Sequence, residues 1–71
     1  MNYKEFTNSS QVKNICYNES TKEMDVLFVA GKKYRYSDVP KYVWESALAA
    51  ESIGKFINSE IKNKYQYTLI S

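Results

Sequence analysis

The chain has 71 residues, 44% of them hydrophobic and 15% aromatic, and ten Lys and Arg residues against eight Asp and Glu give a formal net charge of +2. This length leaves room for one domain only, and so small a charge excess does not require a polyanionic partner. The absence of histidine and the single cysteine, Cys16, exclude an internal disulfide, catalysis by a Cys–His pair and most zinc sites.

The N-terminal half of the chain predicts three antiparallel strands. We expect residues 1–8 to be a flexible segment and residues 9–71 to form the domain. Residues 12–17 and 23–29 are strand-prone and are joined by a polar turn, which indicates a hairpin. Alternation resumes after Gly31 over residues 33–36 and predicts a third strand.

The spacing about Gly31 assigns the faces of the third strand. If Phe28 and Tyr34 lie opposite each other, the loop has an odd number of residues, such as 30–32 with Gly31 in the left-handed conformation. Alternate residues of a strand point to opposite faces. The face that helices must cover then carries Met24, Val26, Phe28, Tyr34 and Tyr36.

The opposite face of this sheet mixes charged and apolar side chains. It is predicted to carry Asn14, Cys16, Asp25, Leu27, Val29, Lys33 and Arg35. Because exposed apolar area tends to mark an interaction site, Leu27 and Val29 are candidate protein-interface residues. The alternative is that the C-terminal tail of the chain covers them.

Two helices are predicted after the strands. Ser37 and Asp38 are cap-forming residues and Pro40 fits a first helical turn, and the helix is expected to end near Ala50. Its apolar face is formed by Val43, Trp44, Ala47 and Leu48. Ser52 is the expected N-cap of a second helix. The apolar stripe of that helix consists of Ile53, Phe56, Ile57 and Ile61.

Residues 65–70 alternate and form a candidate final strand. The sequence thus predicts an α+β fold: a small antiparallel three-stranded meander followed by two helices packed on one sheet face, with this short C-terminal strand as a possible addition.

Several short motifs along the chain resemble those of one family. They are Ser9-Ser10, Ile15-x-Tyr17, Met24-x-Val26-x-Phe28, Gly31, Tyr34-x-Tyr36, Val39-Pro40, Ala50-x-Ser52-x-Gly54-Lys55-Phe56, Asn58, Ile61 and Tyr65. Together they resemble the KTSC domain, a small module named for its occurrence at the C-terminus of some lysyl-tRNA synthetases. The resemblance covers roughly residues 9–67. It implies a free-standing bacterial or phage protein, and the synthetase context of the family suggests RNA binding.

Basic residues are the candidates for contacts with nucleic acid: Lys33, Arg35, Lys41, Lys55, Lys62 and Lys64. A solvated surface of mixed charge is the alternative, because acidic residues are interspersed among them. Tyr34 and Tyr36 flank Arg35 as base-stacking residues would. The strand alternation nevertheless favours core positions for both tyrosines.

A second candidate site, for an anion, lies at the start of the second helix. Ser52, Gly54 and Lys55 combine a capped helix start, room for close approach and a positive charge. The segment is not a Walker A loop, because the first glycine and the spacer are missing. Ordinary helix capping with a closely packed glycine is the alternative.

Catalytic groups are sparse in this sequence. There is no histidine and no evident carboxylate pair, and Cys16 lies within a strand with no base nearby in the sequence. No apolar run approaches the roughly 20 residues of a membrane span. We therefore predict a cytoplasmic protein that contacts no membrane, is not an enzyme, and has no catalytic residues, metal or cofactor.

The first functional hypothesis is a non-enzymatic module that binds RNA or another nucleic acid through the basic residues. The alternative is a protein–protein interaction module. Such a module would be a small bacterial or phage accessory protein that docks on a host protein, or one that self-associates through the outer sheet face at Leu27 and Val29.

Overall fold

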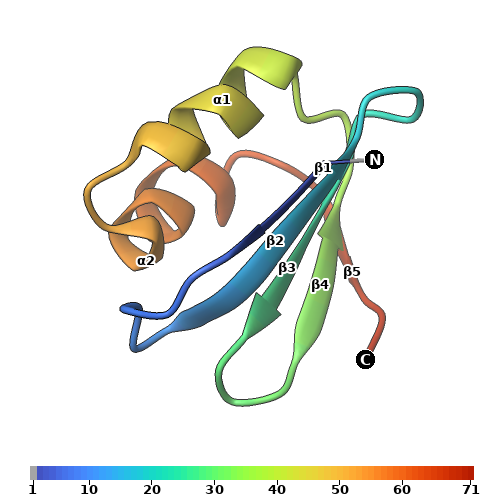
Figure 1. Cartoon of the computed structure of the whole chain (residues 1–71). Coiled ribbons are helices and arrows are strands. Elements are labelled where there is room, and N and C mark those ends of the chain that lie inside the picture. The colour runs from blue at the N-terminus through green and yellow to red at the C-terminus, as the bar shows by residue number, and fades with distance from the viewer. Residues whose placement is uncertain (1) are drawn as a thin grey trace.

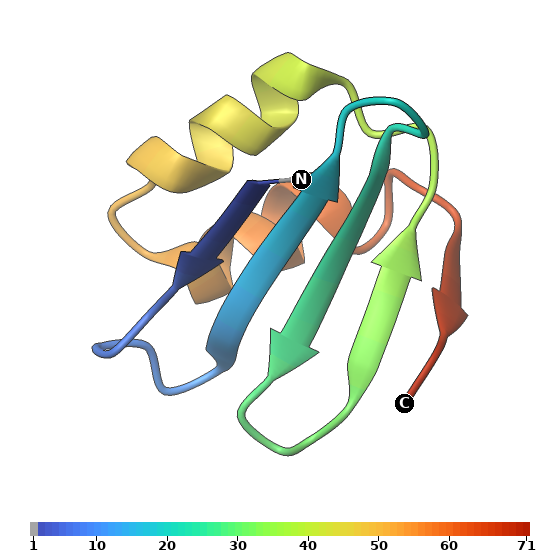
Figure 2. The same ribbon diagram turned by 45° about the vertical axis from the view of Figure 1, so that its right-hand side comes forward.

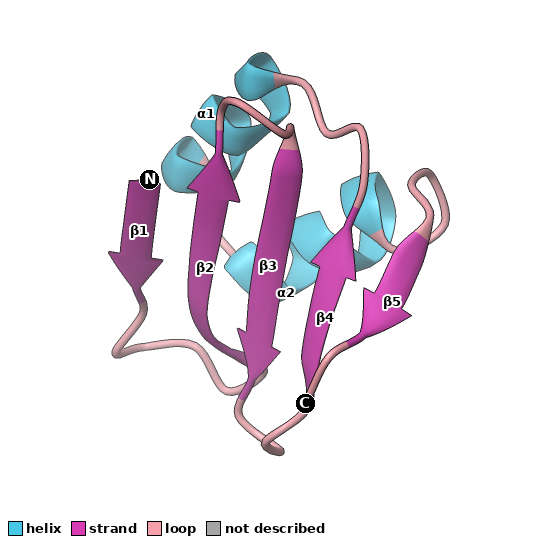
Figure 3. Cartoon of the chain, turned by 90° about the vertical axis from the view of Figure 1, so that its right-hand side faces the viewer, coloured by secondary structure: helices cyan, strands magenta, loops and turns pink. Residues whose placement is uncertain are grey.

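The computed structural model describes residues 2–71, and Met1, part of the segment expected to be flexible, lies outside the described residues. The fold is α+β, with one layer of helices on one face of an antiparallel sheet (Figures 1 and 3). The elements are β1 (Asn2–Glu5), β2 (Val12–Asn18), β3 (Glu23–Phe28), β4 (Lys33–Tyr36), α1 (Lys41–Ala49), α2 (Ile53–Phe56), the π-helical segment η1 (Ile57–Ile61) and β5 (Tyr67–Leu69). Within residues 2–71, no helix has the length and apolar character needed to cross a membrane.

Over residues 2–71 the sheet has five strands in the order β1-β2-β3-β4-β5, which corrects the expected three-stranded meander. The additional N-terminal strand, β1, lies in the segment expected to be flexible and pairs with β2 from Asn2 opposite Tyr17 to Glu5 opposite Asn14. The β1 side chains are largely exposed and polar, so they give no apolar alternation in the sequence. Phe6, just after the strand, packs against the core and anchors it, and its N–H donates to Lys13 O at 2.9 Å.

The candidate final strand is present as β5, beside β4. The chain returns to the sheet after the helices, and β5 runs antiparallel beside β4 (Figure 2). In this pairing Tyr67 lies opposite Tyr36, and Leu69 lies opposite Tyr34. β5 extends the sheet at its edge, so it does not cover the outer face, where Leu27 lies.

The hairpin between β3 and β4 has the expected odd loop but a different register. The Phe28 N–H donates to Lys32 O, and the Gly31 N–H donates to Phe28 O, both at 2.9 Å, so residues 29–31 form the loop. Gly31 has φ +102°, a conformation that favours glycine. Tyr34 lies opposite Val26 rather than Phe28. Because this shift is two residues, the predicted faces are unchanged.

The core lies between the helices and the inner face of the sheet. Its sheet residues include Ile15, Tyr17, Met24, Val26 and Tyr36, all buried. From the helices come Val43, Trp44, Ala47, Ile53, Ile57 and Ile61. Leu48, expected on the apolar face of α1, is 42% exposed, whereas the other three residues expected on that face are buried.

The second helix begins as predicted at Ser52, whose Oγ accepts a hydrogen bond from the Lys55 N–H at 3.3 Å. It starts as α2 and widens into η1, where the Lys62 N–H donates to Ile57 O at 2.9 Å. The first helix starts one residue after Pro40 without a side-chain cap, so the expected capping by Ser37 or Asp38 does not occur.

Candidate functional site

Arg35 and Lys33 lie on the outer face of the sheet, away from the helices. Arg35 Nε and Nη2 donate to the two carboxylate oxygens of Asp25, on the neighbouring strand, at 2.9 and 3.1 Å. These hydrogen bonds and the charge of Asp25 raise the pKa of the Arg35 guanidinium. Two of the five N–H donors of Arg35 are therefore engaged by Asp25, while the Arg35 side chain stays 43% exposed.

Two more of the predicted basic residues are also ion-paired. Lys41 Nζ lies 3.0 Å from Glu19 Oε1, and hydrogen bonding to Glu19 raises the pKa of Lys41. Lys64 Nζ lies 3.1 Å from Glu60 Oε1, one helical turn away. Three of the six predicted basic residues are thus paired with carboxylates of the same chain.

The two predicted protein-interface residues lie in different elements. Leu27 is half-buried on the outer face, opposite Asn14 of β2. Val29 is 55% exposed but belongs to the β3–β4 loop, after the end of the strand. Leu27 thus lies at its expected place on the outer face, whereas Val29 lies in the loop that follows the strand.

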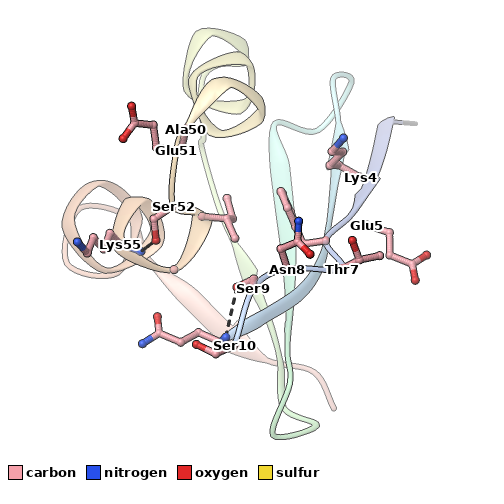
Figure 4. Close-up of a pocket in the computed structure, with 14 residues that line it drawn as sticks. Lys4, Glu5, Thr7, Asn8, Ser9, Ser10, Ala50, Glu51, Ser52 and Lys55 are labelled. Atoms are coloured by element: carbon pink, nitrogen blue, oxygen red, sulfur yellow. Dashed lines mark hydrogen bonds between the residues drawn. The ribbon is translucent and has the colours of Figure 1, made fainter.

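The predicted anion site borders a groove between the β1–β2 loop and the start of α2 (Figure 4). This serine groove has a volume of about 530 Å³ and is lined by residues 4–11 and 50–55. Ser9 Oγ accepts hydrogen bonds from the N–H groups of Gln11 at 3.2 Å and Val12 at 3.0 Å, which fixes the loop. Like Ser52, Ser9 thus has a structural role.

The electrostatics of the serine groove are balanced. Its lining includes Lys4 and Lys55 together with Glu5 and Glu51. Gly54 is buried, and a Cβ at this position would collide with the side chain of Gln11, which lies over it. Close packing of Gly54 is thus observed, and anion binding at Ser52, Gly54 and Lys55 stays a prediction.

A second groove lies between the β3–β4 loop and η1. This lysine groove has a volume of about 590 Å³ and is lined by Ser10, Gln11, Phe28, Val29, Ala30, Lys32, Tyr34, Asn58 and Lys62. Both of its charged residues, Lys32 and Lys62, are cations. The two grooves adjoin, because Ser10 and Gln11 line both.

The aromatic side of the lysine groove belongs to a row of rings that crosses three strands. The Tyr34 ring is held edge-to-face by Phe28, with centroids 5.7 Å apart, and by Tyr67, at 5.3 Å. Tyr36, one step further in, is 2% exposed, whereas Tyr34 is half-buried. The predicted core position is thus confirmed for Tyr36, while Tyr34 lies at the rim of the core and lines a groove.

Lys32, Gln11 and Tyr67 were not identified as site residues from the sequence. Strand alternation could have identified Lys32. It lies two residues before Tyr34 and therefore belongs to the same, inner face of the sheet. Lys62 was identified, but only as part of a general basic surface. Its place in the same groove as Lys32 depends on how the second helix packs on the sheet, which local sequence patterns do not report.

Cys16 is half-buried on the outer face, and burial raises the pKa of its thiol, which favours the unreactive protonated form. Among residues 2–71, no cluster of cysteine and carboxylate side chains could hold a metal ion.

The model of the KTSC domain matches residues 8–65 of the chain. A protein from Tsukamurella paurometabola is 33% identical over 58 residues, which cover 82% of this chain and 87% of that protein. An uncharacterized protein from Stutzerimonas stutzeri is 33% identical over 60 residues, covering 83% and 84%. The fold matches the crystal structure of a KTSC domain protein from Yersinia pestis with a TM-score of 0.89 and 25% identity, over 99% of this chain and 97% of that one.

Proposed function

We propose that this chain, which belongs to the KTSC domain family, is a non-enzymatic module that binds RNA or another nucleic acid in a surface groove. The observation that carries this proposal is the charge of the lysine groove. Lys32 and Lys62 approach it from the loop and the helix, and its lining contains no carboxylate. A concave site with cations alone attracts a polyanion.

The arrangement of charges revises which basic residues take part. Arg35, Lys41 and Lys64 are each paired with a carboxylate of the same chain, which partly compensates their charge toward a phosphate. Lys55 lines the adjoining serine groove, so a flexible strand that leaves the lysine groove past Gln11 would reach it. We therefore assign the main phosphate contacts to Lys32 and Lys62, with Lys55 as an extension.

Fluorescence anisotropy with a labelled single-stranded oligonucleotide at low salt tests this proposal. We expect Lys32→Glu and Lys62→Glu each to weaken binding strongly. Lys13→Glu is the matched control, since Lys13 is exposed, lines neither groove and undergoes the same charge change. Absence of binding by the unmodified chain, or equal losses in all three variants, would contradict the proposal.

A second candidate function is protein–protein interaction, and the β5 edge favours it. Within residues 2–71, β5 pairs with β4 alone, and the side chains of residues 65–71 carry no charge, although edge strands of monomers are commonly protected by charged residues. Leu69 and Ile70 are 53% and 38% exposed. This edge could pair with a strand of a protein partner or of a second copy.

Native mass spectrometry tests self-association through this edge. Leu69→Lys should dissociate a complex formed through β5, whereas Leu27→Glu should dissociate one formed through the outer face. A chain that remains monomeric at micromolar concentration would contradict self-association at either surface.

A further inference from the structure

We infer that the lysine groove accepts an unpaired nucleotide, whose base packs on Tyr34 while its edge meets the amides of Gln11 and Asn58. This inference rests on the proposed nucleic-acid binding and names the chemical form of its ligand. The same groove brings together an aromatic ring, two primary amides and two cations, from three separate parts of the chain.

The aromatic surface is rigid before any ligand arrives. Phe28 and Tyr67 contact Tyr34 from neighbouring strands with interplanar angles of 78° and 84°. A half-buried ring held in this way loses little conformational freedom when a base packs on it. Rigid aromatic side chains are the usual stacking partners of bases in single strands.

The two amides of the groove lining come from elements other than the strand that carries the ring. Asn58 is exposed on η1, and Gln11 ends the β1–β2 loop. The side chain of Gln11 lies over Gly54. Because glycine has no Cβ, there is room at this position for the side-chain amide of Gln11. A primary amide offers both a donor and an acceptor, which suits the hydrogen-bonding edge of a base.

The cations complete the arrangement. Lys32 and Lys62 lie in the lining with the ring and the amides, where they can reach the phosphates on either side of a bound base. In a duplex, neighbouring base pairs cover the ring faces and the partner strand occupies the base edges. The groove therefore favours unpaired nucleotides over double strands.

Three ligands of equal length and label separate this inference from the broader proposal: a single-stranded oligonucleotide, the same backbone with abasic sites, and the corresponding duplex. We expect the abasic strand to bind about 5- to 150-fold more weakly than the intact strand in anisotropy titrations. Equal binding of both strands would overturn base recognition and leave charge-driven binding standing. If no ligand binds, the proposed function itself fails.

Variants of the protein provide a second test. Asn58→Ala should reduce the preference for the intact strand over the abasic one, whereas Asn63→Ala, an exposed asparagine outside the groove, should leave it unchanged. Tyr34→Phe should keep the preference and Tyr34→Leu should lose it. If Tyr34→Leu does not fold by circular dichroism, the Asn58→Ala comparison decides, and an unchanged preference in that variant would overturn the contact.

Discussion

Tyr17 of β2 and Trp44 of α1 stack with their ring centroids 5.7 Å apart and their planes 13° from parallel. The Tyr17 hydroxyl passes beyond this stack and donates to Val39 O at 2.6 Å, in the segment between β4 and α1. One buried side chain thus connects the sheet, the first helix and the loop that joins them.

Tyr17→Phe should destabilise the fold, because it leaves the buried carbonyl of Val39 without its partner while the ring stack is retained. The expected loss in the free energy of unfolding is about 1–2 kcal/mol, measured by urea denaturation. Tyr3→Phe, at an exposed tyrosine of β1, is the matched control and should change the stability little. Similar effects of both substitutions would contradict the role of the Val39 hydrogen bond.

Stability should fall at alkaline pH. Burial raises the pKa of the Tyr17 and Tyr36 hydroxyls above the ordinary value of about 10. The unfolded chain therefore releases these protons at a lower pH than the folded chain. The contribution of these two hydroxyls to the free energy of unfolding is complete below about pH 10. It is lost as the pH rises through their pKa values in the folded chain.

Urea titrations across this pH range, with tyrosinate absorbance followed in parallel, measure the effect. Tyr36→Phe should reduce the slope of the free energy of unfolding against pH in the alkaline range, because it removes one hydroxyl whose pKa is raised. A slope that is unchanged in this variant would contradict the assignment to Tyr36.

Gly31→Ala should destabilise the β3–β4 hairpin through the backbone alone. Gly31 has φ +102°, and a Cβ there would meet no atom within 4 Å, so the cost arises from conformation and not from collision. We expect a loss of about 1–2 kcal/mol in the free energy of unfolding, and a smaller loss for Gly31→Asn. Equal stability of the glycine and alanine forms would contradict this account.

Arg35→Gln and Lys62→Gln remove the same charge from different surroundings. Because the Arg35 guanidinium is engaged by Asp25, its removal should reduce the stability slightly and the affinity for oligonucleotides little. Lys62→Gln should weaken binding and lower the slope of log affinity against log salt by about 0.7, the value for one phosphate contact to a single strand. A larger loss of affinity for Arg35→Gln would place the interface on the outer face instead.

Local signals explain which features the sequence predicted well. Capping of the second helix by Ser52 depends on residues three positions apart, and the inner position of Tyr36 depends on alternation alone. The predicted register of the β3–β4 hairpin was wrong by two residues. A shift of two residues leaves every side chain on the same face of the sheet, so the alternation pattern is the same for both registers. Alternation therefore cannot distinguish Val26 from Phe28 as the partner of Tyr34.

The features that the sequence did not predict depend on distant parts of the chain. β1 forms because β2 offers an edge and Phe6 reaches the core, although its own residues are mostly polar. Lys32 and Lys62 line one groove only after the second helix has packed on the sheet. The neutralisation of Lys41 by Glu19 likewise joins residues from separate elements.

The late return of β5 has a consequence for the order in which the sheet assembles. Strands β1 to β4 pair with their neighbours in the chain, whereas Tyr67 meets Tyr36 only after both helices intervene. Closing that long loop costs more entropy than closing a hairpin, and all three residues of β5 are exposed. We expect β5 to dock last in folding and to open first, so that its amide hydrogens exchange with solvent well before those of β3.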